Sequence, residues 1–154
     1  MPASPSLLGR ALRYLARREH TQRELERKLA PHAESAEQLQ ALMQTLVDKD
    51  LLSEQRAVES WVRAKAPRMG QVRLMHELRQ KGADESLIRE QLGELKDSEI
   101  DRAWQVWCKR FGEVAQTPQD HAKQVRFLTA RGFGSEAISQ VMRRAQNPNI
   151  NLKF

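Results

Sequence analysis

Two stretches of the sequence decide the fold: Leu78–Leu92, which reads LRQKGADESLIREQL, and Leu128–Met142, which reads LTARGFGSEAISQVM. Each contains the end of an apolar helical pattern, a cationic residue, a glycine, a short turn and a new apolar pattern. The leucines that open them are 50 residues apart, and Leu29 lies 49 residues before the first of them. This spacing predicts three tandem repeats of nearly 50 residues, the first of them the least well preserved.

Apolar residues at steps of three and four predict three helices in each repeat, because this spacing places them on one helical face. The predicted stripes span Leu8–Leu15, Leu25–Leu29, Leu39–Leu46, Ala57–Ala64, Leu74–Leu78, Leu87–Leu95, Ile100–Phe111, Val125–Leu128 and Ile138–Met142. Helix starts are expected where a hydroxyl side chain can accept from a first-turn amide. These positions are Ser53, Ser98, Thr117 and Ser135.

A fixed offset aligns four apolar positions in every repeat. Leu29, Leu78 and Leu128 are the reference set. The other sets are Leu39, Ile88 and Ile138, ten residues later; Leu12, Trp61 and Phe111, seventeen earlier; and Leu8, Ala57 and Trp107, twenty-one earlier. We therefore predict repeats at 1–52, 53–97 and 98–146, followed by a polar tail at 147–154.

The glycines of the two stretches, Gly82 and Gly132, have two interpretations. A helix that ends in a residue at positive φ favours glycine, and the cation beside it complements the helix C-terminus. Alternatively, glycine allows a partner's backbone to approach closely. The first repeat has Ala33 at this position, and Pro31 breaks the chain there instead.

Composition supports an all-α protein, since strong helix formers fill the chain and aromatic residues are only 5% of it. One three-helix unit buries too little surface to be stable alone, so stacked units forming an elongated, curved body are expected. The single cysteine, Cys108, excludes an internal disulfide, and neither a signal peptide nor a membrane span is evident. A cytoplasmic protein is the expectation.

No set of residues predicts catalysis, a metal site or a cofactor. The four histidines are scattered without ligand spacing, and no phosphate-binding loop is present. Cys108 lies beside an apolar stripe, which favours a packed or half-buried thiol over a nucleophile. Trp61, Trp104 and Trp107 follow helical spacing, which favours a core role over stacking on bases. We expect a protein that is not an enzyme.

Charge alternates along the chain, whose net charge is +6. Residues 1–29 and 53–82 each hold seven Lys and Arg against three Asp and Glu, and residues 102–154 hold nine against three. Residues 30–52 hold one cation against four anions, and residues 83–101 hold two against seven. Acidic third helices pairing with basic first helices of the next repeat would explain this pattern, although such surface pairs are weak.

The other interpretation is a basic surface that faces an anionic partner. Stacked repeats would align three sets of cations: Arg10, Arg13, Arg17 and Arg18; Arg63, Lys65, Arg68 and Arg73; and Lys109, Arg110, Lys123 and Arg126. Both interpretations can hold together.

Four stretches resemble the RecX family, the bacterial regulators of the RecA recombinase. They are ALRYLARREHTQRELERKL (11–29), LVDKDLLSEQRAVESWVRAK (46–65), MGQVRLMHELRQKGADESLI (69–88) and VRFLTARGFGSEAISQVM (125–142), and together they span almost the whole chain. The missing glycine after Leu29 and the tail NPNINLKF depart from the family pattern.

The resemblance implies a function that periodicity alone does not. Family members bind the RecA filament on single-stranded DNA, in its helical groove across neighbouring subunits. They modulate, and mainly inhibit, ATP hydrolysis, strand exchange and the co-protease activity that drives the SOS response, and thereby regulate DNA repair and homologous recombination. A monomer that touches RecA and the DNA within the filament, with at most weak DNA binding of its own, is the expectation.

Ten cations are predicted to contact the filament, with Arg68, Arg73 and Arg131 the leading candidates because they lie within or beside the family-like motifs. The full set is Arg10, Arg13, Arg17, Arg63, Lys65, Arg68, Arg73, Lys123, Arg126 and Arg131. Two alternatives stay open: a stand-alone DNA-binding protein, since three-helix units can resemble helix-turn-helix modules, and a protein-only helical scaffold.

Overall fold

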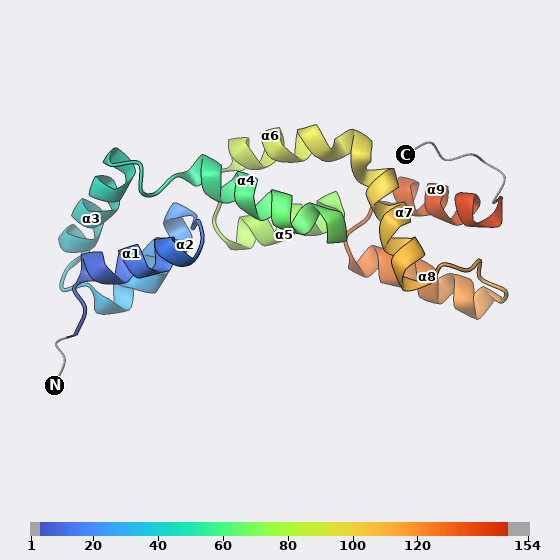
Figure 1. Cartoon of the computed structure of the whole chain (residues 1–154), viewed down its shortest axis with the longest axis horizontal. Coiled ribbons are helices and arrows are strands. Elements are labelled where there is room, and N and C mark those ends of the chain that lie inside the picture. The colour runs from blue at the N-terminus through green and yellow to red at the C-terminus, as the bar shows by residue number, and fades with distance from the viewer. Residues whose placement is uncertain (1–3, 148–154) are drawn as a thin grey trace. The chain divides into compact units, whose positions relative to one another are not determined.

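The computed structural model describes residues 4–147, and every regular element in that range is a helix (Figure 1). This confirms the all-α prediction. The helices are α1 (Leu7–Arg17), α2 (Gln22–Leu29), α3 (Ala36–Asp48), α4 (Glu54–Lys65), α5 (Gln71–Gln80), α6 (Glu85–Leu95), α7 (Glu99–Arg110), α8 (Pro118–Ala130) and α9 (Ser135–Gln146). Short 3₁₀ turns follow three of them: η1 (Ala30–His32), η2 (Ala66–Arg68) and η3 (Lys96–Ser98).

Two of the four predicted helix caps form, and two do not. The hydroxyl oxygens of Ser53 and Thr117 accept from the amides of the residues three positions later, at 3.2 and 3.1 Å. Ser98 has helical backbone angles, and its hydroxyl donates to the carbonyl of Leu95 instead. Ser135 is the first residue of α9, so the capping position falls on Gly134, which has no side chain. At these two helices the prediction of a side-chain cap was wrong.

The chain divides into two compact units, Met1–Trp61 with Leu78–Ile88 and Val62–Glu77 with Arg89–Phe154. In unit 1, helices α1, α2 and α3 share one apolar core. Of the predicted stripe of α1, Leu8 and Leu12 are exposed, at 46% and 41%, whereas Ala11 is buried and Leu15 packs against the core, so half of that prediction was wrong. The core residues are Leu7, Ala11, Leu25, Leu29, Leu39, Met43, Leu46 and Leu52.

In unit 2, helices α7, α8 and α9 close around a second core. Trp107 is 3% exposed, and its indole nitrogen donates to the buried Oε1 of Gln124 at 2.9 Å. The core role predicted for Trp107 is therefore confirmed. Trp104 is half-buried and stacks on Trp107 with ring centroids 5.1 Å apart, and Trp61 in unit 1 is also half-buried. The core residues of the third repeat are Ala103, Trp107, Leu128, Phe133, Ala137, Ile138, Val141 and Met142.

Burial corrects the fixed offset in part of the first helices, although the aligned Ala57 and Trp107 are buried as predicted. The buried first-helix residues of the second repeat include Val58 and Val62, whereas Trp61 is half-buried and Ala64 is exposed. In the third repeat the loop after α7, residues 111–117, is longer than the segment between α4 and α5. A single offset cannot align the first helices across connections of unequal length. The repeat boundaries predicted above stay a prediction, and 148–154 of the predicted tail lie outside the described residues.

Gly82 lies where the second helix of repeat one meets repeat two, a contact that we call joint one. The hydroxyl of Thr21 donates to the carbonyl of the residue before this glycine at 2.8 Å. The amide of Gln22 donates to the carboxylate of Glu54 at 3.0 Å. Gly82 has φ +69°, and a Cβ at this position would lie 2.3 Å from Cδ of Arg23.

Gly132 occupies the corresponding place in unit 2, a contact that we call joint two. The amide of Gly70 donates to the carbonyl of the residue before Gly132 at 2.8 Å. The amide of Gln71 donates to Glu99 at 3.1 Å, as Gln22 does to Glu54 in joint one. Gly132 has φ +89°, and a Cβ there would lie 2.2 Å from Cβ of Arg73.

The helix-end interpretation of the repeated glycines is confirmed, because Gly82 and Gly132 end helices at positive φ. The preceding repeat of the same chain also approaches each glycine, through its backbone at Gly132 and through the side chains of Thr21 and Arg23 at Gly82. Approach by a partner's backbone stays a prediction. Ala33 ends η1 with φ −80° and ψ 143°, an extended conformation that any residue adopts, so glycine is not required at this position of the first repeat.

Candidate functional site

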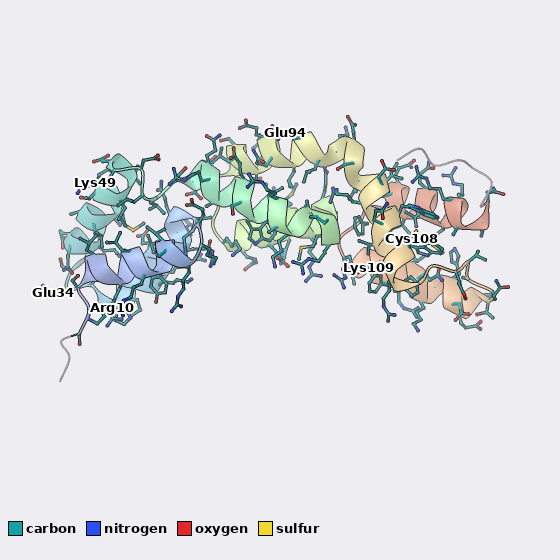
Figure 2. The ribbon with its side chains drawn as sticks, in the orientation of Figure 1. Arg10, Glu34, Lys49, Glu94, Cys108 and Lys109 are labelled. Atoms are coloured by element: carbon teal, nitrogen blue, oxygen red, sulfur yellow. The ribbon has the colours of Figure 1, made fainter. Side chains whose placement is uncertain are left out.

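The ten predicted partner residues lie on the surface of both units, and each unit holds its own set. Three of them, Arg10, Arg13 and Arg17, belong to α1 in unit 1 (Arg10 is labelled in Figure 2). In unit 2, Arg63 and Lys65 end α4, Arg68 ends η2, Arg73 lies on α5, and Lys123, Arg126 and Arg131 lie on or just after α8. Arg10, Lys65, Arg73 and Arg131 are half-buried, and the other six are exposed.

A groove in unit 2 brings two of these residues together with two cations from α7, Lys109 and Arg110 (Lys109 and Cys108 are labelled in Figure 2). We call it the cationic groove. Its volume is about 710 Å³. Its wall is built by η2, α7 and the end of α8, and its lining residues are Pro67, Arg68, Gln105, Val106, Cys108, Lys109, Arg110, Phe127 and Arg131. None of these lining residues is acidic.

Phe127 holds two of the guanidinium groups in place. The Arg131 and Arg110 guanidinium carbons lie 5.1 and 5.5 Å from the centre of its ring. Arg110 also lies 5.4 Å from the ring of Phe111, which meets Phe127 edge to face. Cations over aromatic faces are attracted by the ring quadrupole, and this reduces the freedom that they would lose on binding an anion.

The four cations of the groove have no carboxylate partner within 4.0 Å among residues 4–147. Their charge is therefore uncompensated in the free protein, and a guanidinium fork can bind a carboxylate or phosphate in bidentate fashion. Arg73 differs from them. Its Nε lies 3.1 Å from Glu77 Oε1, and its Nη1 donates to the carbonyl of Ala130 at 3.4 Å, so its side chain is engaged in joint two.

The arginines of α1 form a second cationic surface. Arg10, Arg13 and Arg17 are spaced by three and four residues, which places them on one side of the helix, and none of them forms an ion pair within residues 4–147. The apolar side of α1 faces the core through Leu7 and Ala11. Among residues 4–147 no aromatic ring holds the cations of this surface, so it is a weaker candidate than the groove.

Cys108 is exposed at the cationic groove, which corrects the prediction of a packed or half-buried thiol. Neighbouring protein atoms displace some of the water around its sulfur, and this loss of solvation raises the pKa of the thiol above its ordinary value. A raised pKa leaves little thiolate at neutral pH, so Cys108 is not an activated nucleophile.

Ion pairs between repeats one and two follow the charge pattern at one place and depart from it elsewhere. Within residues 4–147, the pairs that join repeats one and two are Arg56 with Glu19 and Asp50, and Lys81 with Glu24. The α3 carboxylates take part in none of them, because α3 packs against α2 and presents its acidic residues outward. The pair of Arg56 on α4 with Asp50, in the acidic segment 30–52, is nevertheless of the predicted kind, so the prediction is confirmed there but not for the carboxylates on α3 itself.

Glu24 is the most strongly held carboxylate of joint one. Burial by itself would raise its pKa, but hydrogen bonds from Arg18 and from the Thr21 amide and the charges of Lys81 and Arg18 lower the pKa to about 2. Glu54, the other acid of joint one, has a raised pKa, chiefly because it is buried. Joint one is thus built on charge, whereas joint two relies on backbone contact between Gly70 and Gly132.

Sequence reasoning found Arg68 and Arg131 but did not predict the groove that contains them. Arg110 entered only as one of the aligned cations, and the role of Phe127 was not predicted. One signal was available, because Phe127 and Arg131 are four residues apart and such pairs meet on a helix surface. The position of η2 beside α7 is a tertiary feature, and nothing in the local sequence of η2 indicates it.

These observations define an all-helical protein of tandem three-helix units with cationic surfaces suited to anions. The family models for the first, second and third three-helix domains of RecX match residues 8–38, 53–92 and 97–142. The chain belongs to the RecX family. No helix among the described residues is long and apolar enough to cross a membrane.

Curated relatives agree over nearly the full length. The chain is 44% identical to the regulatory protein RecX of Ralstonia nicotianae, covering 94% of this chain and 92% of the relative. It is 42% identical to that of Leptothrix cholodnii, covering 92% and 90%. Among solved structures, the crystal structure of RecX from Lactobacillus salivarius matches with a TM-score of 0.76 at 20% identity, covering 91% of this chain and 94% of that one. This last likeness concerns the fold alone.

Proposed function

We propose that this protein binds the RecA filament assembled on single-stranded DNA and modulates it, mainly by inhibition. It lies in the helical groove of the filament across neighbouring subunits. It lowers RecA ATP hydrolysis, strand exchange and co-protease activity, and thereby regulates DNA repair, homologous recombination and the SOS response. Membership of the RecX family supports the regulatory role, and the elongated, curved body of three repeats predicted from the sequence suits contact with several subunits of a polymer.

The observation that carries the proposal in this chain is the cationic groove. Its four cations are uncompensated, and two of them are held by Phe127 in an arrangement ready to bind carboxylates or phosphates. An uncompensated cationic surface attracts an anionic polymer before contact and raises the association rate. We therefore assign Arg68 and Arg131 the main contacts with the filament.

The other predicted residues have supporting roles in this proposal. Arg63, Lys65, Lys123 and Arg126 extend the basic surface of unit 2, and the arginines of α1 provide the contact from unit 1. Arg73 contributes indirectly, because its side chain is tied to Glu77 and to the carbonyl of Ala130. The protein acts as a monomer, in the cytoplasm, without catalytic activity of its own.

The test is the rate of RecA ATP hydrolysis on single-stranded DNA, with this protein added below the concentration of RecA. We expect strong inhibition by the parent protein and at least a tenfold higher half-inhibitory concentration for the double variant Arg68→Glu with Arg131→Glu. Arg89→Glu is the matched control, because Arg89 is exposed on α6, outside the groove. Circular dichroism establishes that each variant is folded.

Three outcomes would contradict the proposal. No inhibition by the parent protein, with filaments intact by light scattering, would remove the filament as the target. Inhibition that appears only when the protein coats the DNA itself would favour the stand-alone DNA-binding protein. The degree of inhibition would then follow the affinity for DNA that is measured without RecA. Inhibition that is equal for the groove variant and the control would move the contact away from the groove.

A further inference from the structure

The cationic groove combines two chemistries. Arg68, Lys109, Arg110 and Arg131 supply charge at its wall, while Pro67, Val106 and the side of Phe127 supply apolar surface. Val106 is half-buried and packs beside the core of the third repeat, so its exposed part is fixed in position. An occupant that satisfies the whole groove therefore needs negative charge and an apolar group close together.

The aromatic rings at and near the groove are already in contact with other side chains of unit 2. This argues against nucleic-acid bases as the occupants of the groove. Phe127 is contacted by Arg110, Arg131 and Phe111, and Phe111 is contacted by Arg110. Nearby, Trp104 stacks on Trp107 and lies 5.9 Å from the Arg144 guanidinium carbon. Proteins that bind single strands without sequence preference use free aromatic faces on which bases stack. The groove offers cations and aliphatic surface instead.

We propose that the cationic groove binds an acidic protein segment in which carboxylates flank an apolar side chain, and not the phosphates of the DNA strand. The carboxylates pair with the guanidinium groups of Arg110 and Arg131, and the apolar side chain lies against Val106 and Pro67. Held guanidinium groups suit planar carboxylates, because a fork of two donors meets two acceptor oxygens. This inference adds the chemistry of the bound segment to the proposed function. It rests on that function for the identification of the partner as a protein surface and not as DNA.

Cys108 makes the groove observable without a mutation, since it is the only cysteine of the chain, is exposed and lines the groove. The experiment measures its reaction rate with a neutral disulfide reagent. The probes are a short synthetic peptide of Asp and Glu around one Phe, the same peptide with Ala for Phe, and oligo-dT. We expect the first peptide to slow the reaction at least fivefold at saturation. A several times higher concentration of the Ala peptide should be needed to protect Cys108 to the same extent. Oligo-dT should protect Cys108 only weakly.

Binding of the same peptide to the protein variants is measured by fluorescence anisotropy, with a fluorescein label on the peptide. Arg110→Glu should weaken peptide binding at least tenfold, and the control Arg89→Glu should change it less than twofold. Tighter protection of Cys108 by oligo-dT than by peptide, with the same loss in Arg110→Glu, would overturn the inference and assign the groove to nucleic acid. Equal binding of the Phe and Ala peptides would overturn the apolar half of it.

The inference and the proposed function can fail separately. If the peptide protects Cys108 and Arg110→Glu abolishes this protection, the groove binds acidic peptide whatever RecA does. If RecA ATP hydrolysis is then inhibited equally by the parent protein and by Arg110→Glu, the proposed role of the groove in the filament fails alone. If inhibition is lost in Arg110→Glu but no peptide protects Cys108, the inference fails while the proposed function stands.

Discussion

Joint one and joint two follow the same backbone plan but are stabilised by different interactions. In both, an amide at the start of one repeat's second helix donates to a glutamate that begins the next repeat, and a glycine at positive φ receives the approaching chain. Joint one adds a network of charges around Glu24. In joint two, Gly70 takes the place of Thr21, and the two backbones meet directly.

One repeat plan can therefore be stabilised by electrostatics at one contact and by close packing at the next. Charged contacts depend on pH and tolerate small displacements, because long side chains adjust. Backbone contacts do not depend on pH and do not tolerate displacement. Protein interiors are close-packed and cannot absorb an added methyl group where main-chain atoms already touch. The two joints should therefore respond differently to the same substitution and to acid.

The largest effect is expected for Gly70→Ala in joint two. A Cβ there would lie 2.3 Å from the carbonyl oxygen of Gly132 and 2.4 Å from Cα of Phe133, both main-chain atoms. The contact must open, which should lower the free energy of unfolding by about 3 kcal/mol or more. Urea unfolding followed by circular dichroism measures this loss. A variant with the midpoint of the parent protein would contradict the direct backbone contact of joint two.

Acid should act mainly on joint one. The pKa of Glu24 is lowered from 4.5 to about 2 on folding, so the unfolded chain binds this proton more readily. Stability from this group is therefore present above about pH 4.5 and is lost as the pH falls toward 2. The full difference in pKa corresponds to about 3 kcal/mol, and screening by solvent at this partly exposed carboxylate reduces it to roughly 2 kcal/mol.

Glu24→Gln should reproduce the loss at pH 7 and reduce the difference in stability between pH 7 and pH 3. Glu90→Gln serves as the control, because Glu90 is exposed on α6 and forms no ion pair among the described residues. Urea midpoints at the two pH values measure both. An equal pH dependence in the parent protein and in Glu24→Gln would show that the charges of joint one do not stabilise it.

Gly82→Ala should cost less than Gly70→Ala. The backbone at Gly82 has positive φ, which is unfavourable for alanine, but the nearest atoms to a Cβ belong to the side chain of Arg23. The outer part of that side chain can move aside, whereas its Cβ, at 2.8 Å, moves only with the backbone, so we expect a loss of about 2 kcal/mol. The same urea titration compares the two variants directly. A larger loss at Gly82 than at Gly70 would reverse the proposed difference between the joints.

Gly93→Ala should give the smallest change, with the opposite sign. Gly93 lies inside α6, it is exposed, and a Cβ there would have no neighbour within 4 Å. Alanine is favoured over glycine in a helix, so the free energy of unfolding should rise by about 0.5–1 kcal/mol. A destabilised Gly93→Ala protein would indicate that the stability losses of the glycine variants do not measure the two joints specifically.

The sequence by itself determined the helices and their threefold grouping. Apolar spacing and turn residues are local properties, so Thr117 and Ser53 could be recognised as caps and the recurring glycines as helix ends. Local reasoning failed where connections differ in length. Two examples are the exposed Leu8 and Leu12 and the unequal first-helix spacing. Leu7 and Leu8 are equally apolar, so local spacing does not show which of them faces the core.

Only the tertiary structure decided why the glycines recur and where the cations gather. Gly82 and Gly132 are needed partly because another repeat approaches them, which depends on residues far away in the chain. Arg68 and Arg131 are 63 residues apart and share one groove because η2 lies beside α7. Helix formation depends on neighbours in sequence, whereas a binding surface depends on which helix faces come together, and that is settled only when the repeats pack.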